Sequence, residues 1–559
     1  MRVPAGRRGR HERMVPRSGP WRAGLALLAG ALPALAFPAP SLWWFAYAAL
    51  VPWLLLIRSA GTGRRAALDG WLGGTGFLIA VHHWLLPSLH VFLVILAALL
   101  GLLWAPWGLV VFRLLRGRVS AASASAAVVV VPCVWLLIET VRSWQGLGGP
   151  WGLLGASQWQ VAPVLRVASV GGVWLVSLLV VAVNTAVALL CVSRAGRTAG
   201  AGRRVDEGHA AGTARAVGVA GLAVCALSTG ALALWAPGPH PAGVARIAVV
   251  QPGVFTGPRS VERRLASGER LTASLAGRDL DLVVWGESSV GVDPAVRPDV
   301  TARIAALSRR VGADVLINAD ARQTGGSGRT GIYKSAMLVG PHGLTGDRYD
   351  KMRLVPFGEY VPARRVLGWA TSVGRAAGED RLRGTHPVTM RLPGAVGGRG
   401  LRFGPLICFE SAFPDMSRRL TRDGAQLLVV QSSTSTFQHS WAPEQHAALG
   451  ALRAAENGRP VVHATLTGVS AAYDPRGERI GAPLGTDTRG TEVFEVPLAS
   501  GSTLYTRWGD WPVEGAVAVA AGFCAVAGAR AVRARARSGR ERLERPEPEG
   551  PRARRDEAR

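Results

Sequence analysis

Long apolar segments separated by short arginine-containing loops make up most of the first 236 residues of this 559-residue chain. A helix needs about 20 apolar residues to cross the hydrocarbon core of a bilayer, and the segments reach or approach that length. The first segment follows a basic start, but others follow it at once, so we interpret it as a retained helix and not as a signal peptide. We predict seven membrane spans, at 23–40, 41–57, 68–87, 89–112, 121–141, 163–192 and 216–236, and an eighth within 512–532.

The arginines predict how the chain is threaded through the cell membrane. Loops after the second, fourth and sixth spans carry several arginines, whereas those after the first and third carry no lysine or arginine. Because basic loops stay in the cytoplasm, we expect both termini there and the region between the last two spans outside. The formal net charge of +27 is then a topology signal, and we expect no nucleic-acid partner. The predicted parts are a basic N-terminus at 1–22, seven transmembrane helices at 23–236, an extracytoplasmic domain at 237–511, the eighth helix at 512–532 and a basic, disordered tail at 533–559.

The region 237–511 has short apolar runs separated by turns and helical stretches, which is typical of an α/β domain. Its glycine-rich stretch at 324–331 lacks the Gly-Lys-Ser/Thr ending of a phosphate-binding loop, so we expect a hairpin loop there. We predict strands at 247–251, 282–285, 315–318, 336–339, 406–408 and 427–430, and helices at 261–276, 300–311 and 443–456.

Three residues suited to acyl transfer lie at or shortly after predicted strand ends, namely Glu287, Lys351 and Cys408. A thiol reacts as its thiolate, so Glu287 would take the proton from Cys408. The ammonium of Lys351 would stabilise the oxyanion of a tetrahedral intermediate, which is worth roughly 3 kcal/mol per donor. Cys408 is the only cysteine of the polar region and has no disulfide partner there. Each residue alone also has an ordinary interpretation, as a core thiol, a loop carboxylate or a surface cation.

The sequence around these residues carries a resemblance to a known family. The segments are Trp285-Gly-Glu287, Lys351-Met-Arg-Leu-Val-Pro-Phe-Gly-Glu359 and Ile407-Cys-Phe-Glu410. In this order they resemble the Glu-Lys-Cys signature of the nitrilase superfamily. With seven spans before the domain and one after it, the chain resembles the apolipoprotein N-acyltransferase family in particular.

The resemblance implies a nitrilase-like α-β-β-α sandwich and a reaction in two steps. Cys408 would take an acyl chain from a phospholipid as a thioester, and the N-terminal amine of an S-diacylglyceryl-cysteine apolipoprotein would then receive it. Glu287 would be the general base in both steps, Lys351 would stabilise both oxyanions, and Glu359 and Glu410 match acidic residues that support the family's site. The implied protein is a monomer without cofactor or metal, whose partners are membrane lipid, the phospholipid donor and the lipoprotein acceptor.

The chain departs from the family pattern at three places. Gly286 stands where the family usually has proline, and Phe409 where it usually has tyrosine. The stretch Gln431-Ser-Ser-Thr-Ser-Thr-Phe437 replaces an Asn-Asp-x-Trp-Phe-Gly loop, which concerns substrate selection. Two alternatives therefore stay open: a membrane-tethered nitrilase-type amidase with water as acceptor, and a catalytically altered scaffold for a lipid-linked glycosyltransferase.

Two further groups of residues invite a functional interpretation. Trp144, Trp151 and Trp159, in the connection after the fifth span, would lie at the lipid headgroup level. There they would line an entrance for lipids or form an ordinary aromatic belt. The spacing of His439, His446 and His463 does not support a metal site, so we expect roles at a helix surface or behind the catalytic residues.

Overall fold

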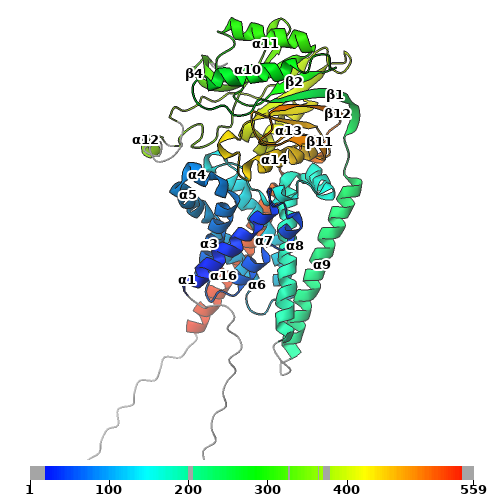
Figure 1. Ribbon diagram of the computed structural model, residues 1–559. Helices are drawn as coiled ribbons and strands as arrows, with labels where there is room; N and C mark the ends of the chain where they lie inside the picture. Colours follow the sequence, from blue (N-terminus) through cyan, green and yellow to red (C-terminus); the bar gives the residue numbers. More distant parts are fainter. Residues whose placement is uncertain (1–18, 199–204, 325–327, 363, 369–377, 544–559) are drawn as a thin grey trace, which may run out of the picture.

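The computed structural model describes residues 19–198, 205–324, 328–362, 364–368 and 378–543. The outer ends of the predicted N-terminal segment and C-terminal tail, at 1–18 and 544–559, lie outside these residues. Figure 1 shows two parts, a bundle of helices and an α/β domain stacked on one end of it. The long helix α9 (Val205–Trp235) leads from the bundle into the α/β domain, and α16 (Trp511–Leu543) runs back along the bundle.

Four helices among the described residues are long and apolar enough to cross a membrane: α7, α8, α9 and α16. A fifth candidate is the pair α5 and α6, which is bent by 44° where we predicted one helix at 89–112. The break follows Gly101, a residue with low helix propensity. The predicted spans 23–40 and 41–57 contain shorter helices, so the count of spans stays a prediction.

The bundle consists of α1 (Pro20–Ala31), η1 (Leu32–Ala36), η2 (Trp43–Tyr47), α2 (Val51–Arg58), α3 (Gly63–Val81), η3 (His83–Leu85), α4 (Leu86–Leu89), α5 (Val91–Gly101), α6 (Trp104–Leu115), α7 (Ala121–Arg142), η4 (Gln145–Leu147), η5 (Leu154–Gln158), α8 (Ala162–Thr198), α9 and α16.

Glycines bring the helices of the bundle into backbone contact. A Cβ atom on Gly30 of α1 would lie 1.9 Å from the carbonyl oxygen of Gly73 in α3, and one on Gly76 would lie 2.0 Å from that of Leu27. Small residues at helix crossings are how membrane helices gain packing contacts. Four fully buried indoles fill the space around this crossing with tilted and edge-to-face contacts: Trp53, Trp104, Trp107 and Trp135.

The α/β domain has two six-stranded sheets. The first has the strand order β12-β1-β2-β3-β4-β5 and the second β11-β10-β9-β8-β7-β6. In each sheet the central strands are parallel, namely β1, β2 and β3 in the first and β7, β8 and β9 in the second. The strands are β1 (His240–Gln251), β2 (Leu282–Trp285), β3 (Asp314–Thr324), β4 (Thr330–Gly340), β5 (Gly343–Asp350), β6 (Met390–Leu392), β7 (Leu401–Ile407), β8 (Leu427–Ser432), β9 (Val461–Thr465), β10 (Ser470–Tyr473), β11 (Arg479–Leu484) and β12 (Gly490–Ser500).

The domain is an α-β-β-α sandwich, as the resemblance implied. Alternate residues of the first sheet face outward onto α10 (Ser260–Ala273) and α11 (Pro298–Val311), while their neighbours pack against the second sheet. On the other side α13 (Pro414–Arg422) and α14 (Ala442–Asn457) cover the second sheet and face the bundle (Figure 1). The carboxyl ends of β2, β7 and β8 lie in the same region of the sandwich, because β7 and β8 are parallel neighbours and the N–H of Glu287, just after β2, donates to Ser432 at the end of β8.

The predicted elements of this domain agree with the structure. Each of the six predicted strands lies on an observed strand, and the three predicted helices correspond to α10, α11 and α14. The hairpin at 324–331 is confirmed, because Thr324 pairs with Thr330 across β3 and β4. The boundaries differ: β1, β3, β4 and β7 are longer than predicted. The prediction also placed Cys408 in a strand, whereas β7 ends at Ile407 and Cys408 begins the short helix η7 (Cys408–Ala412).

A break in α8 joins the two parts. We predicted one continuous helix at 163–192, but Gly171 and Gly172 have non-helical dihedral angles. The break frees the N–H of Val173, which donates to Oε1 of Glu456 in α14 at 2.8 Å. The same oxygen accepts a hydrogen bond from Arg453 at 2.8 Å. A buried carboxylate of the α/β domain therefore caps a helix of the bundle, which fixes how the two parts dock.

Candidate active site

Cys408 lies at the turn between β7 and η7, with an unusual backbone conformation. Its φ is +54°, and Ser288 and Phe357 share this left-handed region, with φ of 56° and 63°. Ser288 directly follows Glu287, and Phe357 lies two residues before Glu359. Each such conformation costs about 1–3 kcal/mol for a residue with a side chain. Three of the seven non-glycine residues with positive φ in the described part of the chain thus lie at or within two residues of Glu287, Glu359 and Cys408.

Glu287 is held where the two sheets meet. It follows β2, and its backbone N–H donates to the carbonyl oxygen of Ser432 in β8 at 3.0 Å. Gly286 approaches the end of β9 so closely that a Cβ atom would lie 2.0 Å from the nitrogen of Leu466. In this structure the close contact between the sheets therefore leaves no room for a side chain at this departure from the family pattern.

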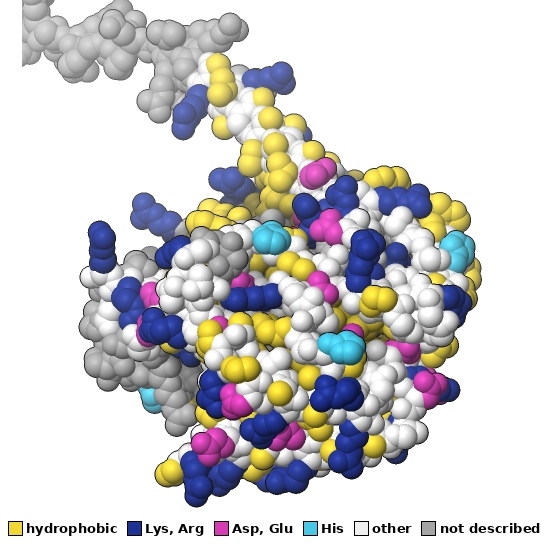
Figure 2. Space-filling model, turned by 90° about the horizontal axis from the view of Figure 1, so that it is seen from above, with side chains coloured by type: hydrophobic (Ala, Val, Ile, Leu, Met, Phe, Trp, Pro, Cys, Tyr) yellow, Lys and Arg dark blue, Asp and Glu magenta, His cyan; other side chains and the backbone are white. Residues whose placement is uncertain are grey.

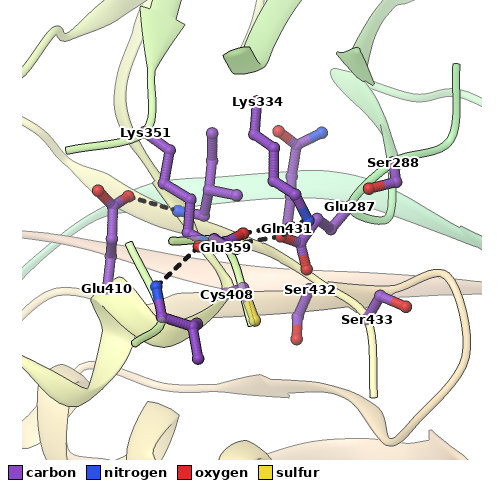
Figure 3. A network of polar contacts seen from close by, with 12 residues as sticks. Glu287, Ser288, Lys334, Lys351, Glu359, Cys408, Glu410, Gln431, Ser432 and Ser433 are labelled. Carbon is purple, nitrogen blue, oxygen red and sulfur yellow. Dashed lines mark hydrogen bonds and ion pairs between the residues drawn. The ribbon is translucent and has the colours of Figure 1, made fainter. Parts of the chain in front are cut away.

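Two lysines and two glutamates form a buried network around this point (Figure 3). Nζ of Lys351 lies 2.8 Å from Oε1 of Glu359 and 3.2 Å from Oε1 of Glu287. Nζ of Lys334 lies 2.8 Å from the same oxygen of Glu287 and 3.2 Å from that of Glu359. Each carboxylate is thus shared by two ammonium groups, and the charges balance.

Lys334 is the member of this network that the sequence analysis missed. It lies in the middle of β4, pairs with Asp320 across the sheet and belongs to no recognised motif. A signal was present, because only two of the 64 basic residues of the chain are lysines, Lys334 and Lys351. In a chain that otherwise uses arginine, both lysines lie on the same pair of carboxylates.

The network fixes the charge of each group. Burial alone would raise the pKa of Glu287, but Lys334 and Lys351 outweigh it and lower the pKa to about 2. Burial, together with the charge of Glu287, raises the pKa of the Cys408 thiol to about 12, although Lys351 opposes this. The resting site therefore holds a protonated thiol beside a charged carboxylate. Figure 3 shows Cys408 next to the carboxylates of Glu287 and Glu359.

Glu410 connects the turn at Cys408 to the segment that carries Lys351. Its Oε2 accepts a hydrogen bond from the N–H of Ile407 at 2.8 Å. Its Oε1 accepts from the hydroxyl of Tyr349 and the N–H of Met352, both at 2.7 Å. Since Met352 follows Lys351 and Ile407 precedes Cys408, the buried carboxylate sets the distance between the lysine and the thiol.

The three histidines have different surroundings. His446 of α14 is buried, and its Nε2 lies 3.0 Å from the carbonyl oxygen of Cys408 while its Nδ1 lies 3.0 Å from Oγ of Ser432. Burial lowers the pKa of His446 to about 4, so the ring is neutral. His463 of β9 contacts it with tilted rings whose centroids lie 4.8 Å apart, whereas His439 is exposed. His446 thus stabilises the turn at Cys408 through its hydrogen bond to the carbonyl oxygen of Cys408. In the described part of the chain, no group of three or more His, Cys, Asp or Glu side chains could hold a metal.

The stretch 431–437, which departs from the family pattern, contributes to both sides of the site. Gln431 ends the parallel pairing with β7, and its Nε2 donates to the carbonyl oxygen of Trp285 at 2.8 Å across the sandwich. Ser433 and Ser435 line a polar cavity of about 520 Å³, whose wall also includes Glu287 and Lys334. Phe437 points the other way and contacts Trp84 of the bundle, with ring centroids 4.8 Å apart.

Aromatic rings separate Cys408 from the bundle. Trp151 is buried and stacks on Phe409, the residue after Cys408, with ring centroids 6.5 Å apart. It also lies 5.3 Å from the ring of Trp84, and its Nε1 donates to Gln445 of α14 at 2.9 Å. The connection after the predicted fifth span thus reaches the site itself.

The other two tryptophans of this connection lie elsewhere. Trp144 is 70% exposed. Trp159 is partly buried, and the guanidinium of Arg479 lies over its ring at 5.2 Å. The three indoles therefore do not line one surface, and the entrance that we predicted from them stays a prediction that rests mainly on Trp151.

Comparison with known proteins gives two family matches. Residues 246–504 match the carbon-nitrogen hydrolase family, and residues 29–186 match the apolipoprotein N-acyltransferase N-terminal domain. Apolipoprotein N-acyltransferase from Geobacter metallireducens is 30% identical over 514 residues, which cover 89% of this chain and 94% of that protein. Apolipoprotein N-acyltransferase 1 from Treponema pallidum is 32% identical over 525 residues, covering 87% of this chain and 92% of that protein.

Two solved structures match about half of this chain. A mutant of the amidase from Nesterenkonia sp. AN1 matches 48% of this chain and 98% of its own, with 19% identity and a TM-score of 0.32. Nit3 from Saccharomyces cerevisiae, a member of the nitrilase superfamily, matches 46% of this chain and 91% of its own, with 18% identity and a TM-score of 0.32.

Proposed function

The chain belongs to the apolipoprotein N-acyltransferase family, and from this premise we propose that Cys408 carries an acyl chain from a phospholipid to the N-terminal amine of a diacylglyceryl apolipoprotein. The observation that carries the proposal is the buried contact of Lys351 with Glu287 and Glu359, next to the strained turn of Cys408. A general base, a cation and a nucleophile are the parts that acyl transfer through a thioester needs.

In the first step Glu287 takes the proton of Cys408 while sulfur attacks the ester carbonyl of the phospholipid. Because the pKa of the thiol is raised and that of Glu287 is lowered, the proton stays on sulfur until a carbonyl is in place. The ammonium of Lys351 stabilises the oxyanion that forms. Collapse of this intermediate releases a lysophospholipid, which takes the proton from Glu287, and leaves the acyl group on Cys408 as a thioester.

In the second step the neutral amine of the acceptor attacks the thioester. Glu287 takes a proton from the attacking nitrogen, the carbon–sulfur bond breaks, and the proton passes to the leaving thiolate of Cys408. Lys351 again stabilises the oxyanion. Glu359 and Glu410 are positioning residues, since Glu359 holds Lys351 at 2.8 Å and Glu410 fixes the turn before Cys408.

The arginine-poor loops after the predicted first and third spans support an extracytoplasmic site, with both termini in the cytoplasm. The apolar rings of Trp151, Phe409 and Trp84 lie between Cys408 and the bundle, on the side from which a lipid chain would arrive. Trp151 would then border the lipid entrance. We also propose that the protein acts as a monomer.

The experiment supplies purified protein with phospholipid vesicles and a synthetic diacylglyceryl-cysteinyl peptide. We expect the peptide to gain the mass of one acyl chain while an equal amount of lysophospholipid forms. The Cys408→Ala variant should yield neither product. Free fatty acid in place of acylated peptide would favour the tethered amidase, and the absence of any product with folded wild-type protein would favour the scaffold.

A further inference from the structure

Building on the function proposed above, we infer that the polar cavity beside Glu287 is the binding site for the amine-bearing end of the acceptor, whose ammonium takes the place that Lys334 now holds on Glu287. The ligand chemistry is a primary ammonium group that continues into a polar chain. Such a group could come from the acceptor's N-terminus or from an ethanolamine headgroup of the donor. We assign it to the acceptor, because only that nitrogen must lose a proton to Glu287 and attack the thioester.

The two lysines of the network differ in their access to this cavity. Lys334 and Glu287 are part of its wall, whereas Lys351 and Cys408 are not. The side chain of Lys334 is 13% exposed and that of Lys351 is fully buried. Lys351 is therefore a fixed part of the interior, and Lys334 is the ammonium that a ligand in the cavity would meet first.

Lys334 has a second carboxylate to move to. Oδ2 of Asp320, from the neighbouring strand β3, lies 3.9 Å from its Nζ. Lysine has a flexible four-carbon stem, so a small change in the rotamer of Lys334 moves its Nζ from Glu287 to Asp320. The incoming ammonium would then contact Glu287 at the vacated position. The charge around Glu287 stays the same, because one ammonium replaces another.

The cavity suits a polar chain and not an acyl chain. Its volume of about 520 Å³ is within the usual range for ligand sites. Its wall includes the polar residues Ser288, Ser433, Ser435 and Arg264 beside the aliphatic Val261, Ile332 and Leu466, and it contains none of the aromatic rings that lie between Cys408 and the bundle. Basic side chains are distributed over the face of the α/β domain that points away from the bundle (Figure 2), and since both lysines are largely buried these are arginines. The acceptor's polypeptide would leave the site through this cavity.

In the transfer step the acceptor loses two protons and gains one acyl group. The acceptor arrives as an ammonium ion and first loses one proton to water in the cavity. Its nitrogen then forms the carbon–nitrogen bond as the carbon–sulfur bond breaks, and Glu287 takes the second proton. That proton passes to the thiolate of Cys408, so the net change is one amide formed, one thiol restored and one proton released.

The first test measures Lys334→Gln, which keeps a hydrogen-bond donor but removes the charge, beside Lys334→Arg, which keeps the charge. If Lys334 competes with the acceptor, the KM for the lipopeptide should fall several-fold in Lys334→Gln. Removing one cation also raises the pKa of Glu287. The acid limb of the pH–rate profile for thioester formation should therefore move to higher pH in Lys334→Gln and not in Lys334→Arg. An unchanged KM with an unchanged acid limb would overturn the inference. Besides Lys334, the charged or titratable groups near Glu287 are Lys351, Glu359, Cys408, His446 and Asp320, the last of which faces Arg264 and Arg381.

The second test narrows the cavity with Ser435→Trp and uses Ser274→Trp, an exposed serine outside the cavity, as the control. Wild type and variants are first loaded with an acyl group and then given either the lipopeptide or hydroxylamine. Ser435→Trp should slow transfer to the lipopeptide at least tenfold relative to thioester formation, while the small amine hydroxylamine still reacts. Equal slowing with both amines, or no slowing, would overturn the inference.

Donor lipids separate the two sources of the ammonium. Phosphatidylethanolamine and phosphatidylglycerol should load Ser435→Trp equally well if the cavity belongs to the acceptor. A loading defect with phosphatidylethanolamine alone would assign the cavity to the donor headgroup and overturn the inference. A wild-type protein that never forms a thioester would instead contradict the proposed function itself.

Discussion

Different kinds of side chain lie on the two sides of Cys408. On one side four charged groups, Lys334, Lys351, Glu287 and Glu359, are buried as balanced pairs, and two of them, Glu287 and Lys334, line a polar cavity. On the other side indole and phenyl rings fill the space up to the bundle. We propose that this division lets one nucleophile serve two unlike substrates, with the polar groups moving protons on one side and the aromatic side receiving lipid. Substitutions on each side should therefore affect different steps.

Replacing Lys351 should have the largest effect on the charged side. In Lys351→Met the oxyanion loses its cation, so we expect the rate of thioester formation to fall roughly 10²- to 10³-fold. The measurement is single-turnover release of lysophospholipid. Arg391→Met removes an exposed cation from β6 and should leave the rate within about twofold. A Lys351→Met variant that keeps the wild-type rate would remove this lysine from the mechanism.

We expect Glu410 to affect thioester formation by positioning Lys351 and Cys408 and not by contacting the substrate. The Glu410→Gln variant has one acceptor oxygen where the wild type has two, and these accept from Tyr349, Met352, Arg353 and Ile407. We expect the rate of thioester formation to fall roughly tenfold, with an unchanged KM for the donor, because a buried donor left unpaired costs about 1–3 kcal/mol. Glu478→Gln, at an exposed turn, is the control. A changed KM with an unchanged rate would instead place Glu410 in substrate binding.

On the aromatic side, Trp151→Ala should raise the KM for phospholipid several-fold and change the pH dependence little. The indole stacks on Phe409 and contacts Trp84. We expect an acyl chain to pack against these rings, so removing the indole would weaken phospholipid binding. Trp144→Ala in the same connection is a matched control, because that ring is 70% exposed. If the two variants behave alike, the division between the two sides loses its support.

The smallest effect on chemistry is expected at the contact between the sheets. A Cβ atom in Gly286→Ala would lie 2.0 Å from backbone nitrogen, so the strand ends must move apart. We expect a loss of about 1–3 kcal/mol in the free energy of unfolding, seen as a lower Tm, with activity reduced in proportion to the folded fraction. Gly394→Ala, which has open space around it, should leave the Tm unchanged. An equally stable Gly286→Ala protein would show that the sheets tolerate separation here.

Much of the α/β domain could be predicted from the sequence, because buried parallel strands such as Leu282–Trp285 are continuous apolar runs. Glu287, Lys351 and Cys408 could be selected because each follows such a run or opens a recognisable motif. Lys334 could not be selected in this way. It enters the site through the pairing of β3 with β4 and the packing of two sheets, which no local pattern records.

The bundle was harder to predict, since hydropathy gives the position of an apolar segment but not its shape. The break at Gly171 and Gly172 depends on a carboxylate from α14, some 280 residues further along the chain, that pairs with the freed N–H of Val173. The bend between α5 and α6 likewise reflects packing against α3, where Gly101 meets Thr75. Tryptophan content likewise did not distinguish the buried ring of Trp151 from the exposed one of Trp144.

The central claim is that Cys408 carries the acyl group between the two sides of the site. The most direct measurement is peptide mass spectrometry of the protein after incubation with phospholipid and no acceptor. We expect an acyl-sized mass increase on the Cys408 peptide that hydroxylamine removes and that Cys408→Ala lacks. A folded wild-type protein with no adduct and no lysophospholipid would contradict it.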